Sequence, residues 1–125
     1  MNNKFNANLQ NIKRFDFRLG NAFGGIKRLA IFFNDDIKIK SNSGTLLDFA
    51  PNKERILAEL KDFCFENWQL KYNDNANPVL ENAWSIELKF DDKTLEFNGL
   101  DDFPDTWQQV ENFVKKYGGF AELLE

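Results

Sequence analysis

Three acidic pairs are the residues of this 125-residue chain whose type and spacing suggest chemistry. They are Asp35-Asp36, Asp91-Asp92 and Asp101-Asp102, the last extended by Asp105. Paired carboxylates bind divalent cations or transfer protons. Each pair, however, falls at a predicted turn or helix start, where aspartate is favoured for backbone reasons, and the spacing of an EF-hand loop is missing. We therefore expect turn and capping roles, no metal and no cofactor.

Other catalytic arrangements lack a component. The chain has no histidine, the commonest general base and metal ligand near neutral pH. Its one cysteine, Cys64, has neither a histidine to activate it nor a disulfide partner. We expect Cys64 to be a buried structural thiol in a reducing cytoplasm. The glycines of residues 20–25 precede Ile26 and a predicted strand, whereas a phosphate-binding loop needs a lysine and a helix there. These features favour a protein that is not an enzyme.

Charge is distributed unevenly along the chain. Residues 1–61 contain 11 Lys and Arg against 6 Asp and Glu, and residues 62–125 contain 5 against 14, for a net charge of −4. An acidic half repels phosphates, so nucleic acid is not the expected ligand. The same half suits a basic protein partner.

The hydrophobic pattern predicts a meander of strands. Alternation in residues 14–19, 37–40 and 84–97 is typical of half-buried strands, with a turn at residues 91–93. Residues 26–34 form the most apolar run and are expected to be the central strand. Trp68 to Tyr72 fits a short strand or an extended edge.

Two helices are expected, each begun by a proline. One starts at or near Pro51 and ends near Asn67, and the other starts at Pro104 and ends at Gly118-Gly119. With the strands they predict one domain over residues 1–125, an α+β fold in which about five antiparallel strands carry two helices on one face. No apolar run is long enough to span a membrane and the first residues do not resemble a signal peptide, so we expect a cytoplasmic protein.

The hairpin and the second helix are expected to gather carboxylates on one edge of the molecule, the acidic rim. A rim of this kind would steer a basic partner into contact. Trp84 and Trp107 fall on apolar faces and are expected in the core, while Trp68 is expected to be partly exposed and to anchor the partner. The residues predicted to bind the partner are Asp91, Asp92, Glu96, Asp101, Asp102, Asp105 and Trp68.

The last third of the chain resembles small bacterial cytoplasmic domains. The resemblance is in Trp84-Ser-Ile-Glu-Leu-Lys-Phe-Asp-Asp-Lys, Phe97-Asn-Gly and Phe103-Pro-Asp-Thr-Trp107. Acidic domains of this size look like immunity proteins of bacterial toxin systems, including contact-dependent inhibition. The resemblance implies a protein that neutralises a toxin domain by occluding its active site, and it brings no catalytic residues. The turn Asp91-Asp92-Lys93 departs from the Asp-Gly usual in that pattern.

Two alternatives remain open from the sequence. A small regulatory or assembly module would associate with itself through a sheet edge or an apolar surface. A carboxylate-based enzyme would bind a metal at the acidic pairs, and we rank it last. On the leading hypothesis the free protein is a monomer or a weak dimer.

Overall fold

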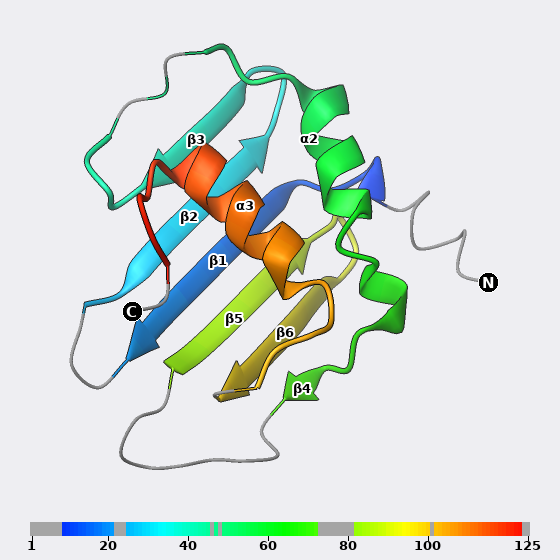
Figure 1. Ribbon diagram of the computed structural model, residues 1–125. Coiled ribbons are helices and arrows are strands. Elements are labelled where there is room, and N and C mark those ends of the chain that lie inside the picture. The colour runs from blue at the N-terminus through cyan, green and yellow to red at the C-terminus, as the bar shows by residue number, and fades with distance from the viewer. Residues whose placement is uncertain are drawn as a thin grey trace.

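The computed structural model describes residues 9–21, 25–45, 47, 49–72, 82–100 and 102–123 (Figure 1). In this part of the chain a six-stranded sheet carries helices on one face. The elements are β1 (Arg14–Asn21), β2 (Lys27–Phe33), β3 (Ile37–Ser41), α2 (Lys53–Lys61), the 3₁₀ helix η1 (Phe65–Asn67), β4 (Lys71–Tyr72), β5 (Asn82–Lys89), β6 (Thr94–Leu100) and α3 (Trp107–Gly118).

The predicted α+β class is confirmed, with one more strand than expected. The strand order is β3-β2-β1-β5-β6-β4, and every pair is antiparallel except β4 with β6. The additional strand, β4, is only two residues long and lies at an edge, within the stretch from Trp68 to Tyr72 expected to be a short strand or an extended edge. The prediction that residues 26–34 form the central strand is wrong, because β1 and β5 occupy the middle of the sheet.

Alternating side chains divide the sheet into an apolar face and a polar face. Phe15 of β1 lies opposite Ile31 of β2 and Leu88 of β5, and all three are fully buried. Their neighbours along each strand point to the other side. Both α2 and α3 lie over the apolar face (Figure 1), so the core is the layer between the helices and the sheet.

The first helix is shorter than predicted. Asn52, rather than Pro51, caps its start, and the Asn52 side chain accepts a hydrogen bond from the Arg55 amide. The helix ends at Lys61 instead of near Asn67, because Cys64 has left-handed backbone geometry with φ 56°. The apolar spacing continues past this point, but those side chains belong to η1 and its approach.

The second helix ends where expected. Gly119 follows it in the left-handed conformation with φ 74°, and the Gly119 amide donates to the Lys115 carbonyl at 3.0 Å. It starts later than expected, at Trp107, since Pro104 belongs to the preceding turn and accepts a hydrogen bond from the Trp107 amide. No helix in the described residues is long and apolar enough to cross a membrane.

Candidate functional site

The structure does not form the predicted acidic rim. Asp91 and Asp92 are exposed in the turn before β6, whereas Asp102 and Asp105 lie in the loop after it. The seven residues of β6 separate the two groups, which at the rise of a β-strand is roughly 20 Å. Because β6 runs from the turn to the loop before α3, the two acidic groups lie at opposite ends of this strand.

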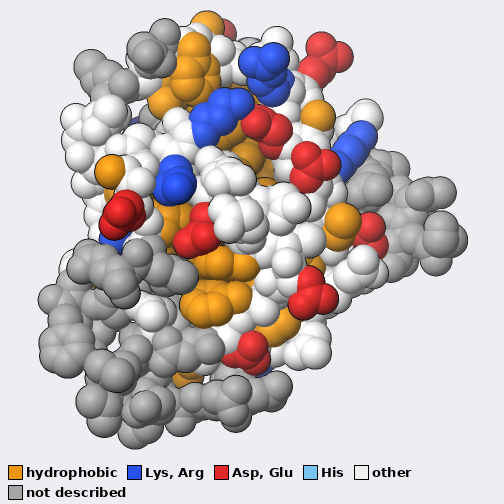
Figure 2. Space-filling view, in the orientation of Figure 1, with side chains coloured by type: hydrophobic (Ala, Val, Ile, Leu, Met, Phe, Trp, Pro, Cys, Tyr) orange, Lys and Arg blue, Asp and Glu red, His pale blue; other side chains and the backbone are white. Residues whose placement is uncertain are grey.

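Glu96 points away from both groups. It lies between Leu95 and Phe97, which face the core, so its side chain is on the helix-free face of the sheet. Asp101 lies outside the described residues. On the helix-covered face the acidic side chains are scattered among neutral and apolar ones (Figure 2). The expectation of one continuous acidic surface is therefore wrong.

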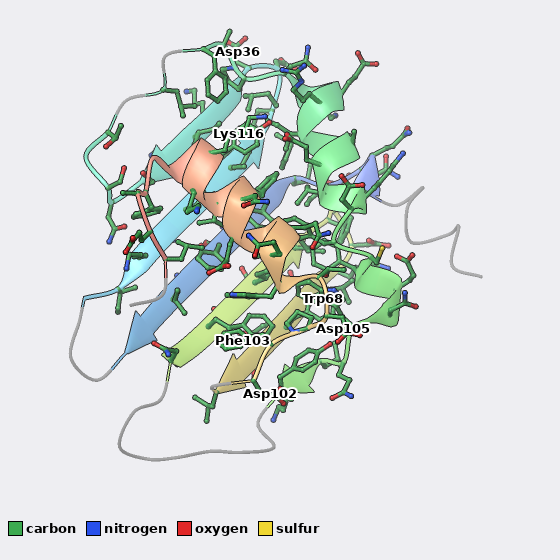
Figure 3. The ribbon with its side chains drawn as sticks, viewed as in Figure 1. Asp36, Trp68, Asp102, Phe103, Asp105 and Lys116 are labelled. Carbon is green, nitrogen blue, oxygen red and sulfur yellow. The ribbon has the colours of Figure 1, made fainter. Side chains whose placement is uncertain are left out.

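One part of the predicted set does come together. Trp68 and Asp105 line the same pocket, of about 250 Å³, between η1 and the loop before α3. Figure 3 shows both of them, with Asp102 and Phe103, at the same end of the molecule. We call this the Trp68 pocket, and its lining is Cys64, Asn67, Trp68, Gln69, Tyr72, Pro104, Asp105 and Thr106.

Trp68 is held firmly at the base of this pocket. Its indole Nε1–H donates to the Phe63 carbonyl at 2.7 Å and lies 3.1 Å from Thr106 Oγ1. Its ring packs on Phe65, with centroids 4.7 Å apart, and on Phe97, at 5.2 Å. Trp68 is partly buried, as predicted, but most of its contacts are structural.

A second indole holds the loop that carries the carboxylates. Trp84 is buried, as predicted, and its Nε1–H donates to the Asp102 carbonyl at 2.8 Å. The Phe103 ring packs at a tilt against Trp107, with ring centroids 4.6 Å apart. Trp107 is also in the core, as predicted. These contacts fix the position of the loop that carries Asp102 and Asp105.

A large apolar side chain is exposed beside the pocket. Leu70 is 60% exposed just before β4. Tyr72 accepts a hydrogen bond from the Gln69 amide, which closes the chain around the pocket. Sequence reasoning missed Leu70, Tyr72 and Phe103, because their role depends on tertiary proximity.

Cys64 forms part of the pocket wall. It is half-buried rather than buried, which corrects the expected environment of the thiol. No disulfide is formed in the described part of the chain. The described residues also contain no group of three cysteine, aspartate or glutamate side chains arranged to hold a metal ion.

A second polar cluster joins the two helices. The Tyr117 hydroxyl donates to the Glu59 carboxylate, and Lys116 Nζ lies 2.9 Å from the other Glu59 oxygen. Burial and, after it, the Glu59 carboxylate raise the pKa of Tyr117 well above its ordinary value of 10.0. Nothing in the sequence pairs these residues, since they lie far apart along the chain.

Comparison with protein families, with curated proteins and with solved structures found no match to this chain. The function is therefore inferred from the residues of the Trp68 pocket. Its lining includes two aromatic side chains and one carboxylate, Asp105, and the exposed Leu70 and the loop residue Asp102 lie close to lining residues along the chain. They can supply apolar contact area together with electrostatic attraction for a cation.

Proposed function

We propose that this protein is a binding protein without catalytic activity, and that its partner is a basic protein which docks at the Trp68 pocket. The observation that carries the proposal is the placement of Asp105 and the exposed Leu70 around one aromatic pocket. Binding energy in protein interfaces concentrates at aromatic anchors in pockets, and nearby charges set the association rate. Both components occur here within one loop cluster.

A cationic side chain of the partner would lie against Asp102 and Asp105, and an apolar neighbour would cover Leu70. The resemblance of residues 84–107 to immunity proteins makes a bacterial toxin domain the partner to test first. The acidic loop would neutralise such a toxin by covering the toxin's basic substrate-binding cleft. This would narrow the predicted contact set to Trp68, Asp102 and Asp105.

The test compares two charge reversals of equal size. The protein is co-expressed with the product of the neighbouring upstream gene, and complex formation is checked by size-exclusion chromatography at low and high salt. Association rates are then measured for the wild type, for Asp102→Lys/Asp105→Lys and for Asp91→Lys/Asp92→Lys. We expect the Asp102/Asp105 variant to associate at least about tenfold more slowly, and the Asp91/Asp92 control to change less than about twofold.

Two results would contradict the proposal. One is the absence of any complex with a basic protein. The other is an equal effect of both variants, since that would make general charge, and not the Trp68 pocket, responsible for binding. Trp68 itself is a poor choice for this test because its removal would disturb the packing of Phe65 and Phe97.

The sheet edges do not favour the alternative of a self-associating module. One edge strand, β3, carries Lys38 and Lys40, and the other, β4, has only two residues. Lysines and short strands are the usual means by which edges avoid pairing with another copy. On this ground we expect the free protein to be a monomer.

A further inference from the structure

The helix-free face of the sheet is basic over β1, β2 and β3. Arg14, Arg18, Arg28, Lys38 and Lys40 all have strand positions that point away from the core. These three strands contain one acidic residue, Asp16. We call the five cations the basic sheet face. It lies on the side of the sheet opposite the Trp68 pocket, and it reflects the excess of basic residues in the first half of the chain.

Asp16 organises the arginines of this face. Its side chain is 7% exposed, Arg28 donates to it at 3.3 Å, and the Nε atoms of Arg14 and Arg18 are each 3.9 Å from it. The Arg18 and Arg28 side chains nevertheless remain 57% and 50% exposed, whereas Arg14 is 31% exposed and its Nη2 donates to Glu87 of β5 at 2.7 Å. Asp16 thus holds Arg28 by a hydrogen bond and lies close to Arg14 and Arg18, while the exposed parts of Arg18 and Arg28 can meet an anion.

A groove of about 570 Å³ runs beside Arg28 and Lys40. Its floor includes Ala30 and Phe32, and Ile26, which is 64% exposed, forms one wall. Asn42 also lines the groove, and its side chain accepts from the Arg28 amide at 2.9 Å. Cationic and apolar side chains therefore lie next to each other along the groove.

We propose that the basic sheet face and this groove bind an acidic protein segment, one in which carboxylates alternate with aliphatic side chains. The carboxylates would pair with Arg18, Arg28 and Lys40, and the aliphatic side chains would enter the groove. A single-stranded nucleic acid is less suited, because base stacking needs a free aromatic face. Lys40 Nζ lies over the Phe32 ring, 5.7 Å from its centroid, and Ile26 provides no ring at all.

The experiment uses fluorescence anisotropy with three labelled probes. The first is the hexapeptide Glu-Leu-Glu-Asp-Leu-Glu, the second replaces its acids by Gln and Asn, and the third is a single-stranded oligothymidylate of similar charge. The variants are Lys38→Glu/Lys40→Glu and, as a milder change, Arg18→Gln. Lys53→Glu/Lys61→Glu on α2 makes the same charge change away from this face, and circular dichroism checks that each variant is folded.

We expect the acidic peptide to bind at micromolar to millimolar concentration and the neutral peptide to bind at least about tenfold more weakly. Lys38→Glu/Lys40→Glu should weaken binding of the acidic peptide about tenfold or more, and the α2 control less than about twofold. Amide chemical shifts should change in residues 26–42 when the peptide is added. Asp102→Lys/Asp105→Lys should bind this peptide as the wild type does, which separates this proposal from the proposed function.

Three outcomes would overturn the inference. The first is no binding of the acidic peptide, and the second is an equal loss in the α2 control. The third is tighter binding of the oligothymidylate with the same dependence on Lys38 and Lys40, which would identify a nucleic-acid surface instead.

Discussion

Gly99 is the residue on which the shape of the Trp68 pocket most directly depends. A Cβ atom at this position would lie 2.5 Å from Trp84 Nε1, 2.6 Å from the Asp102 carbonyl oxygen and 2.8 Å from the Tyr72 carbonyl oxygen. Those atoms belong to β5, the loop before α3, and β4. Only a residue without a side chain lets all three meet, so the hydrogen bond from Trp84 to Asp102 requires this glycine.

Replacing Gly99 by alanine should lower the free energy of unfolding by about 3 kcal/mol, because two of the three neighbours are backbone atoms that cannot move independently. Urea unfolding measures the change. Gly25→Ala is the matched control, since a Cβ there has no neighbour within 4 Å. We expect the control to stay within about 0.5 kcal/mol of the wild type. A mild effect of Gly99→Ala would show that the loop before α3 can shift freely.

At the scale of the element, the start of α2 depends on one side chain. Asn52 Oδ1 accepts a hydrogen bond from the Arg55 amide at 3.0 Å, and Asn52 is itself exposed. Asn52→Ala should therefore lower the free energy of unfolding by about 1 kcal/mol through loss of the cap alone. Asn52→Asp should retain the stability of the wild type. Equal stabilities of the alanine and aspartate variants would contradict a capping role.

The sequence predicted the elements better than their limits. Strict alternation indicated β1, β3, β5 and β6, because a sheet with one covered face demands it of every strand. The end of α2 was missed because it depends on the left-handed backbone of Cys64, a residue type that rarely adopts it. The pairing of β1 with β5 was also out of reach, since alternation shows which face is buried but not which strand lies beside it.

The candidate site was predicted only in part. Proximity along the chain suggested that Asp91 and Asp102 would share a surface, but an intervening strand separates its ends by its own length. Trp68 and Asp105 share a pocket because the residues on either side of η1 are joined to the start of α3: the Phe63 carbonyl accepts from both Trp68 and Thr106. That contact joins segments about forty residues apart, so no local pattern reveals it.

At the scale of the whole molecule, the Tyr117–Glu59 pair makes the free energy of unfolding decrease at alkaline pH. The raised pKa of Tyr117 means that the unfolded chain loses this proton near pH 10 while the folded chain retains it. The contribution to stability is complete below that pH and decreases as the pH rises above it. We expect Tyr117→Phe to show a smaller decrease in unfolding free energy between about pH 8 and about pH 10.5 than the wild type, as measured by urea unfolding.

Glu59→Gln is a second, independent test of this prediction. It removes the carboxylate that, after burial, raises the Tyr117 pKa, so it should also reduce the alkaline decrease. If both variants decline with pH as steeply as the wild type, other groups are responsible for the alkaline instability.

The order of the strands also determines at what point during synthesis the sheet can be completed. The middle strand β1 pairs with β5, and Arg14 lies opposite Lys89. A nascent chain that has reached only β3 thus presents β1 with one side unpaired and with Phe15 and Phe17 uncovered by α3. Strand edges and apolar faces exposed in this way are the features that lead partly made chains to aggregate. Residues 82–89 must therefore emerge from the ribosome before that edge is closed.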